Sequence, residues 1–391
     1  MKNKLQVFFN QYTEIIILAL SGGLLFFGWQ AAENYFTPFY KSVGQLTPAL
    51  KSLSLLYGVV FLGSILAPLL SVKIGLKISL VLGFFSYPLF MFAILTKNIF
   101  FLYPAAICLG LGAGIKGNAE VAYLGAVSPK EKRGRFSGFY WAVVRIGATL
   151  GLIFGSLFLI KGSFTTFYLI LTILASIACV ILLIFLKEPL NQKIIEKQNY
   201  FFTQLKEIFK FIFNPKVLLL APNSIATGFI FGLITAKIPV TIQDLYGVSW
   251  IGVLLFVFQI TRAVLTHPMG IISDKLGRFN MKYIEILISI MGATCFLISK
   301  NIFVLIATLF AFGVDYAIKA SNGPALSLDL FENKIQTASA ASSIIGTLGG
   351  TIPSFLLSTI KSDNYLITVA IALSVIGLIC VKLLANKVQN N

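Results

Sequence analysis

Long apolar stretches follow one another along this chain, each about the length needed to cross a lipid bilayer, with short polar connections between them. A transmembrane helix needs about 20 mainly apolar residues. The pattern predicts twelve such helices, which leave no room for a soluble domain. They cover residues 15–38, 50–71, 78–96, 100–123, 137–160, 164–186, 217–240, 250–271, 281–299, 302–323, 336–359 and 364–384.

One longer interruption divides the predicted helices into two groups of six. Within it, apolar side chains recur at helical spacing opposite Lys206 and Lys210, a pattern typical of an amphipathic helix on a membrane surface. The sequence therefore predicts an all-α membrane protein with an N-terminal six-helix bundle at 1–190. A cytoplasmic linker with the amphipathic helix follows at 191–215, and a C-terminal six-helix bundle occupies 216–391.

Composition and charge agree with this architecture. Hydrophobic residues make up 57% of the chain and charged residues 12%, which is too little polar surface for a soluble globular protein. The net charge is +17, but the cations are scattered over loops, so a nucleic-acid-binding groove is not predicted. With a cytoplasmic N-terminus, 20 Lys and Arg residues fall on the inner side and six on the outer side. This asymmetry predicts that both termini face the cytoplasm. We expect the protein to lie in the plasma membrane.

The two halves of the chain repeat several features at a nearly constant offset. The matching pairs are Lys116 with Lys319, Gly75 with Gly277, and Glu33 with Lys237, at offsets of 203, 202 and 204 residues. Such a repeat indicates a duplicated membrane transporter. Because Glu33 and Lys237 lie near the outer ends of the first and seventh spans, we predict that they pair as an outer gate.

Eight ionisable residues fall inside the predicted spans. Each costs at least about 2.5 to 3.5 kcal/mol at bilayer depth, so such residues are retained mainly where they have a function. The five cations exceed the three acids by two, and a bound anion would complete the balance. An alternative is that the eight residues pair with one another, or with carbonyl groups, to fix helix packing. They are Glu33, Lys116, Glu120, Arg145, Lys237, Arg262, Asp315 and Lys319.

From this set we assign candidate roles. The predicted substrate-binding residues are Lys116, Arg145, Arg262 and Lys319, since arginine and lysine are the side chains that bind carboxylate and phosphate. Glu120 and Asp315 are the candidates for proton coupling, because desolvation and a neighbouring lysine oppose each other in setting the protonation of a carboxyl group.

The loop after the eighth span has a recognisable motif, "GIISDKLGRFN". It resembles the G-x-x-x-D-R/K-x-G-R loop of the major facilitator superfamily. The equivalent loop of the first half keeps Lys73, Gly75 and Lys77, but Val72 stands where the acid belongs. The residues that match the motif are Gly270, Asp274, Lys275, Gly277 and Arg278.

The first half, over about residues 20–155, resembles the Unc-ninety-three-like branch of that superfamily. The segments "LGLGAGIKGNAEVAYL" and "RGRFSGFYWA" carry the resemblance, together with the stretch at 53–90. The resemblance implies twelve helices in two bundles, with spans 1, 4, 7 and 10 lining a central cavity. It also implies alternating access by rocking of one bundle on the other.

These observations predict a secondary active transporter of a small organic or phosphorylated anion, with proton coupling as an added feature. The alternative is a non-transporting membrane regulator or trafficking partner, which would bind a protein. No nucleophile elbow, zinc-helix motif or phosphate loop occurs, so an enzyme is not predicted. No cofactor is predicted, and the single histidine, His267, argues against a histidine-based metal site.

Overall fold

Helices account for nearly all of the described chain. The computed structural model describes residues 2–128, 133–189, 206, 210–331, 345, 351–352, 355–356 and 363–389. Within these ranges, eleven helices are long and apolar enough to cross a membrane, and no strand occurs. The all-α prediction is confirmed, as are eleven of the twelve spans. Most of the remaining span, at 336–359, and most of the linker at 191–215 lie outside the described residues.

The chain divides into two compact units. Unit 1 comprises Met1–Phe39 and Val59–Phe201, and unit 2 comprises Tyr40–Gly58 and Phe202–Asn391. The helices of the N-terminal half are α1 (Lys2–Ser42), α2 (Leu46–Ile74), α3 (Leu76–Thr96), α4 (Ile99–Val127), α5 (Arg133–Phe158) and α6 (Phe164–Phe185). Those of the C-terminal half are α8 (Pro215–Gly232), η2 (Leu233–Lys237), α9 (Ile238–Tyr246), α10 (Trp250–Leu276), α11 (Arg278–Ile298), α12 (Ile302–Phe331) and α14 (Asp363–Gln389).

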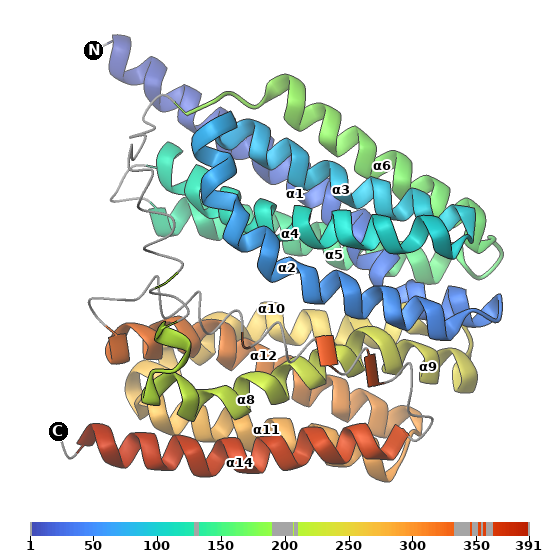
Figure 1. Ribbon diagram of the computed structural model, residues 1–391, viewed down its shortest axis with the longest axis vertical. Helices are drawn as coiled ribbons and strands as arrows, with labels where there is room; N and C mark the ends of the chain where they lie inside the picture. Colours follow the sequence, from blue (N-terminus) through green and yellow to red (C-terminus); the bar gives the residue numbers. More distant parts are fainter. Residues whose placement is uncertain are drawn as a thin grey trace. The chain divides into compact units, whose positions relative to one another are not determined.

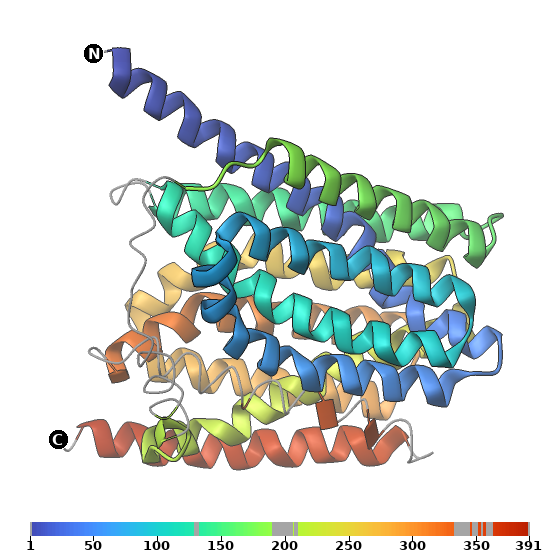
Figure 2. The same cartoon turned by 45° about the horizontal axis from the view of Figure 1, so that its top comes forward.

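Within each unit the helices lie side by side. In unit 1, α3 packs against both α4 and α6. In unit 2, α12 packs against α10 and α11, while α14 packs against α8 and α11 (Figure 1). The turned view in Figure 2 keeps α3 and α4 together.

Several helices begin where a side chain replaces the missing backbone partner of the first turn. Asn98 accepts a hydrogen bond from Phe100 N at 2.9 Å and starts α4. Asn214 accepts from Lys216 N at 2.9 Å, and Pro215 follows it as the first residue of α8. Asparagine at the N-cap and proline at the first helical position are both preferred there. The local sequence thus sets these boundaries.

The seventh span contains an irregular segment that the apolar pattern does not reveal. Residues Leu233–Lys237 form one turn of π-helix between α8 and α9, and Ile238 N bonds to Leu233 O instead of the carbonyl four residues back. Pro239 follows directly. Proline has no N–H and its ring clashes with the carbonyl four residues earlier, so the α-helical ladder cannot run through it unchanged. Such wider turns occur frequently at functional sites.

Close helix contact in unit 1 depends on glycine. A Cβ atom at Gly147 would lie 2.1 Å from Gly23 O, and one at Gly151 would lie 2.0 Å from Phe27 O. Both distances are far below van der Waals contact, so α5 can approach α1 only with glycine at these positions. Small residues at four-residue spacing allow this kind of packing between membrane helices.

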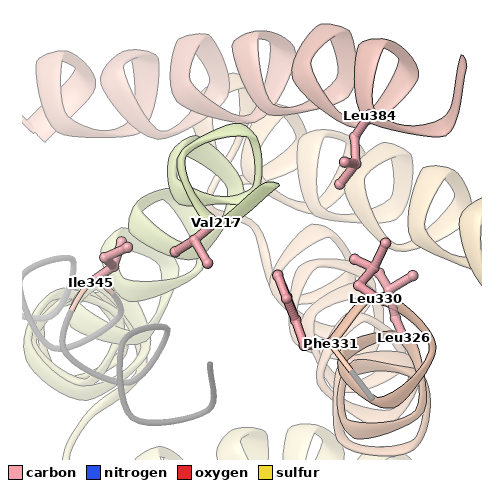
Figure 3. Close-up of a cluster of buried hydrophobic side chains, with 6 residues drawn as sticks. All are labelled: Val217, Leu326, Leu330, Phe331, Ile345 and Leu384. Carbon is pink, nitrogen blue, oxygen red and sulfur yellow. The ribbon is translucent and has the colours of Figure 1, made fainter. Parts of the chain in front are cut away.

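An apolar cluster joins three helices of unit 2. Figure 3 shows Val217 of α8, Leu384 of α14 and three side chains of α12 pointing toward one another. Leu384 is fully buried and Val217 nearly so. The cluster lies beside the loop motif, because Phe279, directly after Arg278, packs against it. Its members are Val217, Leu326, Leu330, Phe331, Ile345 and Leu384.

Candidate functional site

In unit 1, α4 carries a buried ion pair. Lys116 and Glu120 are one helical turn apart, which places them on the same face. Their side chains are 3% and 1% exposed, and Lys116 Nζ pairs with Glu120 Oε1. The hydroxyl of Tyr140, from α5, donates a hydrogen bond to the same oxygen. We call these three residues the Lys116 cluster. The lysine charge is neutralised within it.

Aromatic rings surround the ammonium group of this cluster. Lys116 Nζ lies 4.6 Å from the ring centroid of Phe26, on α1, and 5.1 Å from that of Phe84, on α3. A cation over a ring face is attracted by the ring quadrupole, and the attraction is stronger away from water. Helices α1, α3, α4 and α5 therefore all contribute to the environment of one charge.

Arg145 has a different environment from Lys116. It is exposed on α5, and its Cζ lies 5.8 Å from the ring centroid of Trp141. Trp141 in turn contacts Tyr140 edge-on, with centroids 5.2 Å apart. Within the described residues no carboxylate lies close enough to Arg145 to form an ion pair. The structure thus links Arg145 to the Lys116 cluster through rings, and leaves its charge available.

The two residues predicted to form an outer gate lie in different units. Glu33 is buried on α1 and accepts a hydrogen bond from Gln30 Nε2 at 3.1 Å. Lys237 is half-buried and ends the π-helical turn. Their pairing stays a prediction. Within unit 2, Lys41 at the end of α1 forms an exposed ion pair with Asp244 of α9.

In unit 2, α12 carries Asp315 and Lys319, again one turn apart. Asp315 is 1% exposed, and its Oδ2 has no hydrogen-bond partner among the described residues. Lys319 is half-buried, with Nζ 6.0 Å from the ring centroid of Tyr316. The two do not form an ion pair within 4.0 Å, unlike Lys116 and Glu120.

Two aromatic rings connect the predicted substrate-binding cations of unit 2. Arg262, on α10, has its Cζ 5.2 Å from the ring centroid of Phe258. Phe258 contacts Tyr316 of α12 edge-on, with ring centroids 5.4 Å apart. Lys319 Nζ in turn lies over the ring of Tyr316. The structure therefore brings Arg262 and Lys319 to neighbouring helices along one row of side chains. Arg262 has no ion pair in the described part of the chain.

Sequence reasoning missed two ionisable residues and one amide of unit 2. On α11, Lys282 Nζ pairs with Glu285 Oε1 at 2.6 Å, and both side chains are buried. Asn223 of α8 donates to the same oxygen at 3.3 Å. Neither is among the eight ionisable residues assigned to the interiors of the predicted spans, because both lie near the start of the span at 281–299. Their three-residue spacing was the signal that could have identified them. Adding one cation and one acid leaves the cationic excess at two.

The loop motif of unit 2 forms a closed hydrogen-bond circuit. Arg278 Nη1 donates to Ser273 Oγ at 2.8 Å, Ser273 donates to Asn322 Oδ1 at 2.7 Å, and Asn322 Nδ2 donates back to Arg278 O at 3.0 Å. Arg278 also pairs with Asp274 at 2.7 Å. Gly277 connects α10 to α11 with a φ of +88°, which favours glycine. Of the other motif residues, Lys275 is exposed and Gly270 is half-buried.

The equivalent loop of unit 1, between α2 and α3, has no acid of its own at residue 72 but contacts an acid from another part of the chain. Glu188, which follows α6, accepts hydrogen bonds from Leu76 N at 2.7 Å and Lys77 N at 2.9 Å. A carboxylate at this place satisfies the free N–H groups of the first turn of α3. Gly75 has a φ of +87°, and a Cβ atom there would lie 2.9 Å from the Glu188 carboxylate. Glu188 therefore supplies this loop with a carboxylate, which its own sequence lacks at residue 72.

Comparison with known proteins identifies the family. Residues 18–354 match the Major Facilitator Superfamily. The chain belongs to this superfamily. Among solved structures, a POT family transporter in complex with a thioalcohol conjugated peptide is similar with a TM-score of 0.74 and 13% identity, over 96% of each chain. The peptide transporter POT in complex with sulfate gives a TM-score of 0.75 at 11% identity, over 97% of this chain and 94% of the other. The predicted major facilitator fold is confirmed.

Two curated members of the superfamily are similar over part of their length. UNC93-like protein 3 of Arabidopsis thaliana is 31% identical over 140 residues, which are 33% of this chain and 29% of the relative. The synaptic vesicular amine transporter of Bos taurus is 25% identical over 257 residues, 64% of this chain and 47% of the relative. The matched segments thus span less than half of either relative. The resemblance to the Unc-ninety-three-like branch is confirmed, and the chain is an integral multi-pass membrane protein.

Proposed function

We propose that this member of the superfamily is a secondary active transporter of a small organic or phosphorylated anion. The observation that carries the proposal is the set of cations without a carboxylate partner. Arg145, Arg262 and Lys319 have no ion pair among the described residues, and each lies beside an aromatic ring. An unpaired charge at membrane depth is costly, and a bound anion offsets that cost.

The residue types fit an anion with two or more oxygens. The guanidinium groups of Arg145 and Arg262 offer a planar fork that matches carboxylate or phosphate, whereas the Lys319 ammonium is a point charge. The rings of Trp141 and Phe258 restrict where the guanidinium groups can point, which reduces the entropy lost on binding. Lys116 contributes less in this scheme, because Glu120 neutralises it.

Proton coupling would use acids that lie close to these cations. Glu120 and Asp315 are both buried, and each shares a helix face with a lysine. When an anion binds near such a pair, the balance between the carboxylate and the lysine changes, and proton uptake restores it. Transport would proceed by alternating access, as superfamily membership suggests.

Two other functions follow from the relatives. The vesicular amine transporter is named for amines, so a transported cation is the competing substrate class. The likeness to UNC93-like protein 3 supports a membrane regulator that carries no solute and binds a protein partner instead. The excess of unpaired cations favours the anion over the amine, and its location inside the spans favours a bound solute over a protein partner.

Uptake into proteoliposomes separates these functions. Purified protein is reconstituted, and labelled carboxylates, phosphates, amines and neutral solutes are offered with and without an inward proton gradient. We expect uptake of one or more anions, faster with the gradient, and loss of this uptake in Arg262→Gln. Empty liposomes and Lys387→Gln, which changes an exposed cation in the last turn of α14, serve as controls.

Each other outcome points to a particular alternative. Preference for amines or neutral solutes refutes the anion assignment. Anion uptake that ignores the proton gradient refutes the coupling but not the substrate class. No uptake of any solute, by protein whose thermal unfolding shows that it is folded, favours the regulator.

We also propose that both termini face the cytoplasm of a plasma-membrane protein, since the lysine and arginine asymmetry is 20 to six. Cysteines introduced near Lys2 and near Asn390, the second of which lies outside the described residues, should not react with an impermeant thiol reagent added to intact cells. A cysteine introduced near Lys161, in a predicted outer loop, should react. Labelling of either terminus from outside would reverse the orientation.

A further inference from the structure

Four ionisable side chains of unit 2 lie in matching positions on the two arms of a helical hairpin. Helix α11 ends at Ile298 and α12 begins at Ile302. Glu285 lies 13 residues before the end of α11, and Asp315 lies 13 residues after the start of α12. At a rise of 1.5 Å per residue, both are about 20 Å from the connecting turn. The two acids are therefore at the same level of the hairpin.

The two lysines of this group share the next level. Lys282 is one turn before Glu285 on α11, and Lys319 is one turn after Asp315 on α12. Because the helices are packed against each other and run in opposite directions, the two acids share one level of the hairpin and the two lysines share the next. Lys319 interacts electrostatically with Lys282, Glu285 and Asp315. We call these four residues the four-charge cluster.

Each acid of the cluster has one oxygen without a partner. Glu285 is fully buried and Asp315 is 1% exposed. Glu285 Oε1 accepts from Lys282 and Asn223, but Glu285 Oε2 and Asp315 Oδ2 have no hydrogen-bond partner among the described residues. A buried polar atom left without a hydrogen bond costs about 1–3 kcal/mol, and more when it is charged. Glu285 Oε2 and Asp315 Oδ2 are two such atoms, and they belong to acids at the same level of the hairpin.

The neighbouring helices add little charge at this level. From α8 the cluster receives the amide of Asn223, and from α10 it receives Arg262 only through the rings of Phe258 and Tyr316. On α14, the buried side chains of the described residues are apolar apart from Ser374. Among the described residues, the charged groups at the level of the two acids are therefore those of the cluster itself.

The geometry points to a proton shared by Glu285 and Asp315, as a second proton site that lies in unit 2 and does not involve Glu120. Two carboxylates at close range in a dry place do not both remain ionised, because one proton placed between them removes the repulsion. The proton comes from solvent, one carboxyl donates it, and the other carboxylate accepts the hydrogen bond. Both orphaned oxygens are then satisfied. The pair titrates as a unit and not as two separate acids.

Charge balance connects this proton to an anion, a step that rests on the proposed function. With both lysines charged and both acids ionised, the cluster is neutral. One shared proton gives it a charge of +1 and frees Lys319 from the attraction of Asp315. An anion bound at Lys319 then restores neutrality, so proton and anion are taken up together.

Infrared difference spectroscopy of purified protein in lipid nanodiscs tests the shared proton without any substrate. We expect a protonated-carboxyl band that appears in a single titration step in the wild type. Glu285→Gln and Asp315→Asn should each remove the whole band, because the two lysines of the cluster favour the ionised form of a single acid that has no second acid to share a proton with. Asp329→Asn, which removes an exposed acid of the same helix, should leave the band unchanged.

Separate titration would overturn the proposal. If Glu285→Gln and Asp315→Asn each retain a band from the other acid, or if the wild type shows no protonated carboxyl, no proton is shared. Glu285→Asp keeps the carboxyl and should shift the band without removing it, so this variant decides the question if Glu285→Gln does not fold. A shared band in protein that transports no anion refutes the proposed function alone. Anion transport with separate bands refutes the shared proton alone.

Discussion

The two halves of this transporter-type chain repeat their charged positions but not their ionic contacts. In unit 1, Lys116 and Glu120 form a buried ion pair that Tyr140 completes. In unit 2, the equivalent Lys319 has no ion pair within the described residues, and Asp315 keeps an unbonded oxygen. Helix α11 adds Lys282 and Glu285, which pair with each other. The repeated positions therefore differ in their contacts: Lys116 is paired with a carboxylate on its own helix, whereas Lys319 is not.

The two loop motifs also differ in their contacts, because their acids come from different parts of the chain. Unit 2 has its acid inside the motif, where Asp274 pairs with Arg278 at 2.7 Å. Unit 1 takes its acid from Glu188, 116 residues further along the chain than Val72, and uses it to bind backbone N–H groups. An equivalent site can thus be filled by a residue that no local comparison of the two halves would find.

The largest expected effect comes from breaking the closed cluster. Lys116→Met leaves Glu120 as a buried charge without its cation, which costs about 3–5 kcal/mol. Lys319→Met should cost much less, because no carboxylate lies within ion-pair distance of Lys319. Unfolding in mixed micelles measures both changes, and Lys116→Met combined with Glu120→Gln should recover most of the loss. Equal losses at Lys116 and Lys319 would show that the two halves do not differ.

Anion binding should show the opposite order. Arg262→Gln and Arg145→Gln each remove a charge-assisted contact, which contributes about 1.5–3 kcal/mol, or roughly a 10- to 150-fold change in Kd. Lys319→Gln should have the next largest effect on Kd. Lys116→Gln should have the smallest effect, because Lys116 is already paired with Glu120. Calorimetric titration with inorganic phosphate and a small carboxylate measures the order, and the unfolding temperatures of Arg145→Gln, Arg262→Gln and Lys319→Gln should stay close to the wild type. If the four substitutions only unfold the protein, the residues are structural.

A smaller difference is expected at the two loop glycines. Gly75 and Gly277 both adopt a backbone conformation that is rare for other residues, with ψ values of 163° and 149°. Replacing glycine with another residue there costs on the order of 1–3 kcal/mol. Gly75→Ala should destabilise more than Gly277→Ala, because its Cβ meets the Glu188 carboxylate, whereas nothing lies within 4 Å at Gly277. Thermal unfolding compares the two variants. A larger loss at Gly277 would contradict the role given to Glu188.

The smallest expected effect concerns the predicted outer gate. Glu33→Gln or Lys237→Gln should favour opening to the outside, and exchanging the two charges should partly restore closure, with a coupling of at least about 0.5 kcal/mol. Labelling of an outward-facing cysteine by an impermeant reagent reports the opening. The exposed pair Lys41 and Asp244 provides the matched control, with a coupling of no more than about 1 kcal/mol that weakens in salt. A cycle with no coupling between Glu33 and Lys237 would count against the gate.

The sequence by itself determined the membrane architecture. Eleven predicted spans coincide with helices, because about 20 consecutive apolar residues have few alternatives to a membrane helix. Asn98 and Asn214 set helix starts through local hydrogen bonds. Most of the buried lysines and acids were also visible, since a charge inside an apolar stretch stands out in any single sequence, but Lys282 and Glu285, near the start of their span, were missed. The family followed from the loop motif at Gly270–Arg278, whose residues are adjacent in the chain.

Only the tertiary structure decided which charges are paired. Lys116 and Lys319 look equivalent in the sequence, yet their partners depend on side chains from other helices: Tyr140 in one case, and α11 in the other. Glu188 meets α3, and Glu285 meets the level of Asp315, through packing between segments that sequence spacing does not connect. An ion pair forms within a few ångströms, and helix packing sets distances on that scale. The sequence therefore identified most of the candidate residues, and the fold determined which of them have an ion pair within the described residues.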